Sequence, residues 1–352
     1  MNILIIKPSS LGDVIHALPF LGAVKDTFPD ASIDWVISKN LQGLLEDHPM
    51  INELIPFNKD AWKNLRHLSD TLSEAKALRK KLQSRHYDWV VDLQGLLRSG
   101  ILSYFAPGTK KIGFDNAREG SRYFYDIRVS VDPDTHAVDK CLEVARRMGA
   151  DVQRASFPLH IPEHAKLEAS SLIGGIDKYI VIVPSARWDT KRWSAEHFRS
   201  LVSMVNIPCI ITGSRGDRKI AQTIMDAEGP GVTRGIKSDS PENPASGQRV
   251  IDLCGKTDLQ NLAALIAGAR AVVSNDSGPM HIAAALDIPT IAVFGPTDPL
   301  KTGPYGWRSN KKMIVLTGDA PCSPCRKKTC SKFVCMDMVS VDAVYKELKS
   351  YL

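Results

Sequence analysis

The stretch that decides the fold opens the chain: residues 1–28, MNILIIKPSSLGDVIHALPFLGAVKDTF. Its β-branched run at residues 3–7 ends at Pro8-Ser9-Ser10, and a helical pattern follows over residues 13–28. The strand is apolar without alternation, which is typical of a parallel sheet with helices on both faces. A strand that leads through a short loop into a helix begins a βαβ unit, so this stretch predicts an α/β fold.

The same alternation of apolar strands and helical patterns recurs along the chain. Further apolar strands are predicted at residues 33–37, 54–57, 88–93, 179–183, 207–212, 250–253, 271–274 and 290–294. A long amphipathic helix is predicted at about residues 60–85, and residues 229–248 predict an exposed, mobile loop. This alternation of strands and helices weakens only at residues 158–175, where we place the domain boundary.

We therefore expect two doubly wound parallel-sheet domains, residues 1–165 and residues 175–335. Residues 336–352 form a C-terminal segment whose helix could pack on either domain, including back on the first. Ligands of such sheets bind beyond the carboxyl ends of the strands, so the expected site is a central cleft that the domains face.

Composition narrows the class of protein. The 352 residues include 45 Lys and Arg against 39 Asp and Glu, a net charge of +6, with 43% hydrophobic residues, as in soluble globular proteins. No apolar run approaches the roughly 18–20 residues that cross a bilayer, and the start lacks the basic region and cleavage site of a signal peptide. We expect a cytoplasmic protein whose mild positive charge suits anionic partners or an anionic leaflet.

The loop after the first strand holds the first candidate site. It contains one glycine, Gly12, so it is neither the dinucleotide fingerprint nor a P-loop, which counts against NAD binding and nucleotide hydrolysis. Asp13 could be a catalytic carboxylate, held ionised at a helix N-terminus and able to accept a proton. It could also simply complete the first helical turn, and the residue alone favours that simpler interpretation.

Two loops of the second half are candidates for binding an anion. Residues 184–193, PSARWDTKRW, combine three cations and two aromatic rings, which could grip a phosphate or form a solvated basic loop. Residues 274–281, SNDSGPMH, predict a helix N-terminus that offers backbone N–H groups. Together with residues 294–299, FGPTDP, they are typical of a nucleotide-sugar pocket, although His281 alone is more often structural.

Five ordered motifs carry a family resemblance. The segments IIKPSSLGDVIHALPFL, YDWVVDLQGLLRSG, TKRW, NDSGPMHIAAAL and VFGPTDP resemble the ADP-heptose:lipopolysaccharide heptosyltransferases, from Met1 to about Gly306. IDWVI, NARE and HAVDK most resemble heptosyltransferase I. The resemblance implies an inverting glycosyltransferase of the GT-B fold, whose second domain binds ADP-heptose and whose first domain binds the lipid-linked Kdo acceptor. It implies an enzyme at the cytoplasmic face of the inner membrane, with no cofactor and no nucleic-acid partner.

The resemblance also implies residue roles. Asp13 stands at the position of the general base and Lys191 at that of the phosphate-binding lysine, with a catalytic role for both. The implied donor-binding residues are Ala186, Arg187, Lys191, Asp217, Thr257, Asp276, Ser277, Gly278, Pro279 and His281. The candidate acceptor-binding residues are Lys7, Ser10, Gly12 and Arg118. A guanidinium matches carboxylates with two hydrogen bonds, although Arg118 could instead pair with Glu119.

The sequence departs from the family pattern in four places. Heptosyltransferase I has a threonine at the position of Arg187 and a methionine at that of Thr257, where contact through the backbone would survive the change. Residues 58–64, in the region that meets the acceptor, carry fewer arginines, and the loop at residues 229–248 is longer.

Four cysteines crowd near the end of the chain, with the spacing C-x₂-C-x₄-C-x₄-C: Cys322, Cys325, Cys330 and Cys335. Four thiolates could hold zinc or an iron–sulfur cluster, but this spacing matches neither common zinc ribbons nor standard ferredoxins. We expect reduced thiols or a structural disulfide. No D-x-D pair accompanies the candidate loops, so the transfer reaction would require no metal.

Other functions remain open at this point. Within the class, the chain could transfer a second heptose or another sugar. A dinucleotide-dependent oxidoreductase is disfavoured by the missing glycine fingerprint. A non-catalytic nucleotide-sugar sensor would keep its function in an Asp13→Ala variant, whereas an enzyme would lose turnover.

Overall fold

The chain folds into two compact units, Met1–His160 and Ile161–Leu352, in a computed structural model that describes residues 1–58, 68–226 and 250–352. The side chains of residues 68–72 are also outside the description. Residues 59–64 of the arginine-poor segment, and the predicted loop at residues 229–248, lie outside the described residues.

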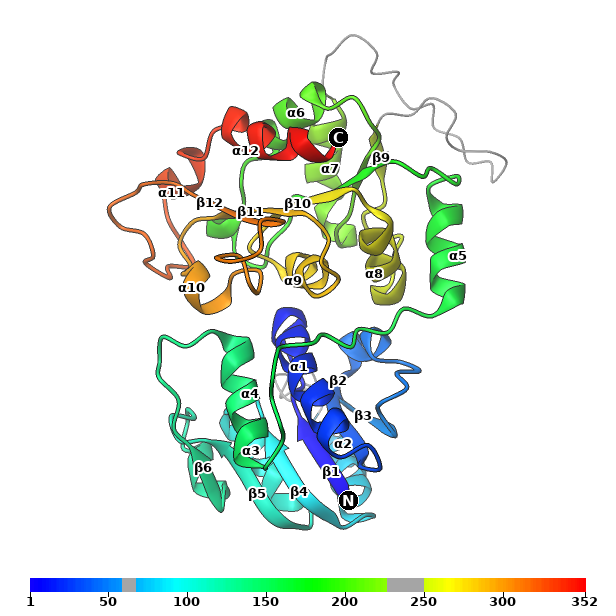
Figure 1. Ribbon diagram of the computed structural model, residues 1–352, viewed down its shortest axis with the longest axis vertical. Coiled ribbons are helices and arrows are strands. Elements are labelled where there is room, and N and C mark those ends of the chain that lie inside the picture. Colours follow the sequence, from blue (N-terminus) through cyan, green and yellow to red (C-terminus); the bar gives the residue numbers. More distant parts are fainter. Residues whose placement is uncertain (59–67, 227–249) are drawn as a thin grey trace. The chain divides into compact units, whose positions relative to one another are not determined.

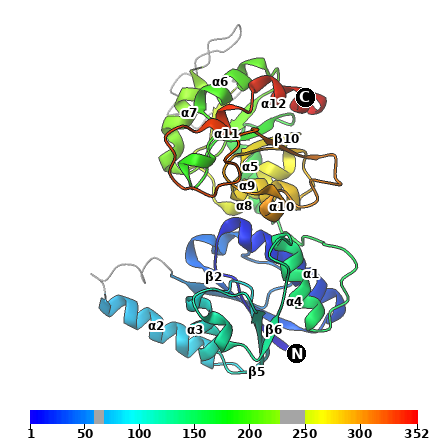
Figure 2. The same cartoon turned by 90° about the vertical axis from the view of Figure 1, so that its left-hand side faces the viewer.

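The first unit is built on one parallel sheet with the strand order β3-β2-β1-β4-β5-β6. Its strands are β1 (Asn2–Ile6), β2 (Ser32–Ser38), β3 (Glu53–Phe57), β4 (Tyr87–Asp92), β5 (Gly108–Phe114) and β6 (Ile127–Val129). Its helices are α1 (Leu11–Thr27), α2 (Leu68–Gln83), α3 (Leu97–Phe105) and α4 (Ala137–Arg147), with single 3₁₀ turns η1 (Lys39–Leu44) and η4 (Ser121–Phe124). Helices α1 and α4 pack together on one face of the sheet, and α2 and α3 on the other (Figure 1, Figure 2).

The second unit contains a second parallel sheet, with the order β12-β11-β10-β7-β8-β9. Its strands are β7 (Ile180–Val183), β8 (Cys209–Ile211), β9 (Val250–Asp252), β10 (Ala271–Asn275), β11 (Thr290–Phe294) and β12 (Met313–Thr317). Its longer helices are α5 (Glu163–Leu172), α6 (Ala195–Met204), α7 (Arg218–Met225), α8 (Leu259–Gly268), α9 (Gly278–Ala285) and α12 (Val341–Leu348). The short helical turns are α10 (Pro299–Thr302), α11 (Val334–Asp337), η5 (Asp189–Lys191), η6 (Arg215–Asp217) and η7 (Lys349–Tyr351).

The C-terminal helix belongs to the second unit. Helix α12 packs against α6, and its Val344 and Leu348 are fully buried in the core that β7, β10 and β11 also form. The sequence left open whether this helix packs back on the first domain, and its apolar side chains are instead buried on the second sheet.

Both sheets share one topology. Counted within its own unit, each sheet has the strand order 3-2-1-4-5-6, which is the doubly wound order. The predicted α/β class is therefore confirmed. In this order the chain reverses direction across the sheet between the first and fourth strands, so the switch points lie between β1 and β4 and between β7 and β10. Ligands of doubly wound sheets bind beyond the carboxyl ends of these strands.

Three strands were missed by the sequence prediction: β5, β6 and β12. Two of them, β6 and β12, are edge strands, and β5 carries two glycines and two lysines. Strands β5 and β6 contain charged residues, so they lack the continuous apolar run that marks a strand buried on both faces. Strand β12 does carry such a run, MIVLT, and the sequence prediction overlooked it. Among the described residues, no helix is both long and apolar enough to cross a bilayer.

Candidate active site

Lys7 crosses the switch point of the first sheet. It follows β1, only 7% of it is exposed, and its Nζ donates a 2.6 Å hydrogen bond to the carbonyl oxygen of Leu93, which follows β4. Lys7 forms no ion pair with any residue that the structure describes. Because a buried ammonium without a counter-charge is costly, this position favours an anionic ligand.

Asp13 begins α1 beside the same switch point. Its Oδ2 accepts hydrogen bonds from the backbone N–H of Ser10, at 2.7 Å, and from the Ser10 hydroxyl, at 2.6 Å. Both donors stabilise the ionised carboxylate, and the N-terminus of a 17-residue helix adds a favourable field. Gly12 is buried in the same turn. The geometry thus supports either of the roles that the sequence allowed for Asp13.

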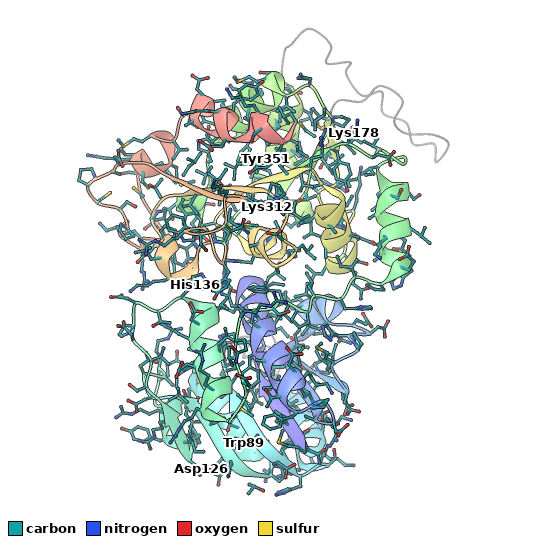
Figure 3. The ribbon with its side chains drawn as sticks, in the orientation of Figure 1. Trp89, Asp126, His136, Lys178, Lys312 and Tyr351 are labelled. Carbon is teal, nitrogen blue, oxygen red and sulfur yellow. The ribbon has the colours of Figure 1, made fainter. Side chains whose placement is uncertain are left out.

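The start of α4 lies beside that of α1. The ring of His136, which precedes α4 (Figure 3), is 5.4 Å from the ring of His16 in α1. One turn further along α4, burial raises the pKa of the Cys141 thiol to about 11, and the charges of Lys7 and Asp13 also act on it. The HAVDK motif therefore adjoins the Lys7 and Asp13 region.

A buried carboxylate supports this corner of the sheet. Asp92 ends β4 with no exposed surface, and burial raises its pKa. Its Oδ1 accepts from the backbone N–H groups of Gln94 and Gly95, at 2.8 and 3.0 Å, and its Oδ2 from the Tyr125 hydroxyl at 2.6 Å. The Gln94 side chain in turn accepts from the N–H of Ser9 at 3.3 Å, so this network fixes the loops on both sides of the switch point.

Arg118 is exposed on the loop that follows β5. Its backbone N–H donates to the carbonyl oxygen of Gly95 at 2.9 Å, which anchors the loop beside the end of β4. Glu119 does not pair with it: its Oε2 accepts from the backbone N–H of Leu97 at 3.1 Å and caps α3. The structure therefore gives no support to the alternative in which Arg118 and Glu119 pair with each other.

The switch point of the second sheet holds the central donor-site candidates. Lys191 Nζ lies 2.6 Å from Asp276 Oδ2, with the two side chains 17% and 6% exposed. The Thr297 hydroxyl donates to the same Oδ2 at 2.5 Å. Asp276 Oδ1 accepts no hydrogen bond from the described residues, so it remains available to a hydroxyl of a ligand. These three residues come from the loops after β7, β10 and β11, and the fold joins three of the predicted motifs.

Helix α9 presents its N-terminus at the same place. Ser277 is its N-cap, Gly278 and Pro279 open it, and His281 is buried in its first turns. The free backbone N–H groups of a helix N-terminus favour an anion such as phosphate. The preceding Asn275 accepts from the Trp193 N–H at 2.9 Å and donates to the Pro184 carbonyl oxygen at 2.8 Å, which ties the β10 loop to the β7 loop.

The remaining donor candidates lie at their own strand ends. Ala186 is buried, and its carbonyl oxygen accepts from Arg192 Nε at 3.0 Å, whereas Arg187 is exposed. Asp217 lies after β8, and its Oδ2 accepts from the N–H and the hydroxyl of Ser214 at 2.8 and 2.6 Å. Thr257 is half-buried in the loop after β9.

The four clustered cysteines are all free thiols. Cys335 is buried and Cys322 and Cys330 are exposed, while two backbone N–H groups lower the pKa of Cys330. Within residues 1–58, 68–226 and 250–352, no three His, Cys, Asp or Glu side chains converge as metal ligands would.

The family follows from comparison with known proteins. Residues 75–334 match the model of Glycosyltransferase family 9 (heptosyltransferase). The chain belongs to this family. It is accordingly an enzyme, a glycosyltransferase of the GT-B fold, as the resemblance implied.

Similar heptosyltransferases cover nearly the whole chain. The chain is 32% identical to lipopolysaccharide heptosyltransferase 1 of Pseudomonas aeruginosa, over 94% of this chain and 88% of that protein. It is 30% identical to lipopolysaccharide heptosyltransferase 1 of Escherichia coli K12, over 87% and 91%. The solved E. coli heptosyltransferase WaaC with ADP is similar at 26% identity and a TM-score of 0.79, with both chains fully covered.

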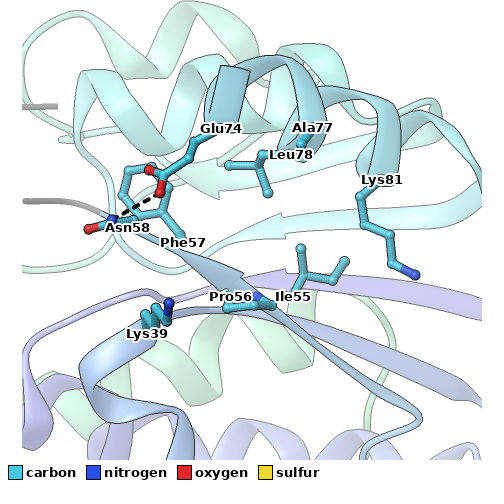
Figure 4. A pocket seen from close by; sticks show the side chains of 9 residues that line it. All are labelled: Lys39, Ile55, Pro56, Phe57, Asn58, Glu74, Ala77, Leu78 and Lys81. Carbon is cyan, nitrogen blue, oxygen red and sulfur yellow. Dashed lines mark hydrogen bonds between the residues drawn. The ribbon is translucent and has the colours of Figure 1, made fainter. Parts of the chain in front are cut away.

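One pocket of the heptosyltransferase chain lies away from these residues. It measures about 320 Å³ and lies between β3 and α2, with Ile55, Phe57 and Leu78 on its wall and Lys39 at its rim (Figure 4). Strand β3 is the edge strand, separated from β1 by β2. The pocket contains none of the predicted site residues.

Sequence reasoning missed two features of the site. One is the buried Asp92 and Tyr125 network, whose members are 33 residues apart and carry no shared motif. The other is the contact of the cysteine segment with the donor loops, where the Thr190 hydroxyl donates to the Lys327 carbonyl oxygen at 2.9 Å. The basic run CRKK was the available signal for the second, and only the fold shows where it lies.

Proposed function

We propose that this heptosyltransferase moves heptose from ADP-heptose to the Kdo of a lipid-linked lipopolysaccharide inner core, with inversion at the anomeric carbon. The observation that carries the proposal is the Lys191–Asp276 pair at a switch point, beside the N-terminus of α9. The relationship to lipopolysaccharide heptosyltransferase 1, over 94% of this chain, supports the choice of substrates.

The second unit binds the donor in this proposal. The diphosphate contacts the N–H groups at Ser277 and Gly278 and the ammonium of Lys191. Asp276 Oδ1 accepts from a hydroxyl of the heptose. Asp217 binds the ribose and Thr257 the adenine, and the other donor-binding residues of the proposal are Ala186, Arg187, Pro279 and His281.

The first unit binds the acceptor. Kdo carries a carboxylate, which suits the buried cation Lys7 and the exposed guanidinium of Arg118. Ser10 and Gly12 form the turn that fixes Asp13. Asp13 is the general base, because its carboxylate is held ionised by two hydrogen bonds and by the helix N-terminus.

The chemistry uses one base and fixed positive charge. Asp13 removes the proton of the acceptor hydroxyl as its oxygen attacks the anomeric carbon, on the face opposite ADP, and the bond from that carbon to the diphosphate breaks. General-base help of this kind contributes roughly 10²–10⁴-fold to the rate. Negative charge grows on the leaving diphosphate, so Lys191 and the α9 amides stabilise the transition state more than the ground state.

No cofactor takes part in this proposal, because Lys191 and the helix N-terminus already supply positive charge to the leaving group. The net charge of +6 attracts the enzyme to the anionic cytoplasmic face of the inner membrane, where the acceptor is held. Vesicle sedimentation tests this attraction, since binding that does not weaken with salt would contradict it.

The deciding experiment offers purified protein ADP-heptose and acceptors of defined core length. We expect heptose to be added to Kdo₂-lipid A, with the product linkage inverted relative to the donor. Transfer only to an acceptor that already carries one heptose would assign the later step instead. If the protein binds ADP but transfers heptose to none of the acceptors, the proposed substrates are wrong, and a nucleotide-sugar sensor is the better interpretation.

A further inference from the structure

The cysteine-rich segment, residues 320–335, is tied to the donor-site loops. The Ser323 hydroxyl donates to the carbonyl oxygen of Gly295 at 2.6 Å, and the Arg326 N–H donates to that of Pro296 at 2.7 Å. Both acceptors follow β11. The carbonyl oxygen of the next residue, Lys327, accepts from the hydroxyl of Thr190, in the loop after β7.

These attachments bring the segment to the second switch point. In the sheet order β11-β10-β7, the loops after β11 and β7 flank the loop after β10, which carries Asp276. A segment bonded to both flanking loops therefore lies beside the Lys191–Asp276 pair. Buried Cys335 holds its far end, because it packs against Gly295 with its Sγ 3.1 Å from the position of a Cβ there.

The segment brings positive charge without negative charge. It carries Arg326, Lys327, Lys328 and Lys332, with no Asp or Glu between Ala320 and Cys335. All four are exposed, and none forms an ion pair with a residue in the described part of the chain.

One of these cations shares an aromatic ring with the donor-site lysine. Lys328 Nζ lies 5.3 Å from the ring centroid of Trp188, and Lys191 Nζ lies 4.8 Å from the same centroid. Each ammonium is attracted by the ring, so Trp188 contacts both cations. The charge of Lys191 is matched by Asp276, whereas Lys328 forms no ion pair with any carboxylate that the structure describes.

We propose that Lys328 is a second cation for the diphosphate of the donor, held in place by Trp188 and by the cysteine-rich segment. This inference rests on the proposed function, because it assumes that a nucleoside diphosphate binds at Lys191. An ADP leaving group carries more than one negative charge, and the Lys191–Asp276 pair together is neutral. Lys328 supplies the missing positive charge, and the segment's three backbone and hydroxyl attachments position it.

Calorimetric titration with ADP, AMP and adenosine tests the assignment. In the Lys328→Ala variant we expect ADP to bind about fivefold more weakly, the size of effect that one exposed charge has on a phosphate. Adenosine binding should stay unchanged, because it lacks the diphosphate. Lys332→Ala is the matched control: it removes the same charge from the same segment away from Trp188, and ADP affinity should change less than about twofold.

The remaining outcomes separate this inference from the proposed function. Lys328→Arg should restore ADP affinity, since a guanidinium keeps the charge and stacks on an aromatic ring. Equal losses in the Lys328 and Lys332 variants, or a Lys328→Ala protein that binds ADP as the wild type does, would overturn the inference and leave the proposed function standing. A folded wild-type protein that binds no ADP would overturn both.

Discussion

The two switch points use the same residue type in opposite ways. In each sheet a lysine from the loop after the first strand reaches the loop after the fourth. Lys7 meets a neutral carbonyl oxygen at Leu93, whereas Lys191 meets the carboxylate of Asp276. The acid of the first switch point, Asp92, likewise accepts hydrogen bonds from neutral donors, the N–H groups of Gln94 and Gly95 and the hydroxyl of Tyr125. The topology is shared, and the distribution of charge is not.

This difference indicates what each site is prepared to bind. The second site holds the ion pair of Lys191 and Asp276. When a donor binds, Lys191 can contact a phosphate and Asp276 can accept from a sugar hydroxyl. The first site holds the buried cation Lys7, and no carboxylate of the described residues contacts it directly. Such a cation gains most from an incoming anion, and a sugar acid such as Kdo supplies one.

Two aspartates with the same local geometry have different proposed roles. Asp13 with Ser10, and Asp217 with Ser214, form the same capping arrangement in the sequences SLGD and SRGD. One is the proposed base and the other a proposed ribose ligand. The turn fixes where the carboxylate lies, and the strand it follows decides which substrate it meets: β1 is central in its sheet, and β8 is next to the edge.

The largest expected effect distinguishes these two aspartates. Asp13→Ala should lower kcat by about 10²–10⁴-fold, because the acceptor hydroxyl loses its base. Asp217→Ala is the matched control, and it should act mainly on donor affinity. Steady-state transfer assays measure both. An Asp13→Ala enzyme within tenfold of wild-type kcat would refute the base assignment.

The same substitution at both switch-point lysines tests the charge comparison. Lys191→Met should weaken ADP binding by about tenfold and destabilise the fold by about 2 kcal/mol, a value reduced for partial exposure, because Asp276 loses its counter-charge. A double variant with Asp276→Asn should recover most of the stability. Thermal unfolding and ADP titration provide the two readouts.

Lys7→Met should have little effect on stability. No carboxylate of the described residues loses a direct partner, and the apolar side chain avoids the desolvation of an ammonium. The free energy of unfolding should therefore change by less than about 1 kcal/mol. The KM for the acceptor should rise by about tenfold, with ADP affinity unchanged. A Lys7→Met protein as unstable as the Lys191→Met protein would contradict the claim that the two lysines differ in their charge partners.

The smallest effect concerns Asp92 and pH. Its raised pKa means that the folded protein keeps this proton to a higher pH than the unfolded chain does, so the wild type loses stability as pH rises above about 4 towards the raised pKa. Asp92→Asn removes that dependence, since an amide oxygen can accept from Gln94 and Gly95 and its NH₂ can donate to Tyr125. Melting temperatures at pH 4–8 should diverge in favour of the variant, and parallel curves would contradict the prediction.

The sequence predicted those parts of the fold in which local pattern and burial agree. Nine strands are mostly apolar and largely buried, and they were recognised within one or two residues at each end. Strand β5, with the sequence GTKKIGF, exposes its lysines, and β6 has only three residues. Their pairing depends on neighbours distant in the chain, which periodicity does not report.

The candidate site shows the same limit. Motifs placed Lys191, Asp276 and residues 294–299 at three strand ends, and the sheet order then brought them together. The contact of Lys328 with Trp188 joins residues 140 positions apart, at the surface, without any spacing rule. Such contacts follow from tertiary packing of an irregular segment. The sequence alone showed that the segment is basic, but not which residues it contacts.

The division of labour between the two units is the central claim, and one measurement tests it most directly. ADP-heptose is titrated into the Asp13→Ala protein, whose turnover is expected to be lost, and the dissociation constant is compared with that of the wild type. The account predicts equal constants within about twofold, because the donor is bound by the second unit alone. A loss of donor affinity as large as that in Lys191→Met would show that Asp13 belongs to donor binding, and the account would be wrong.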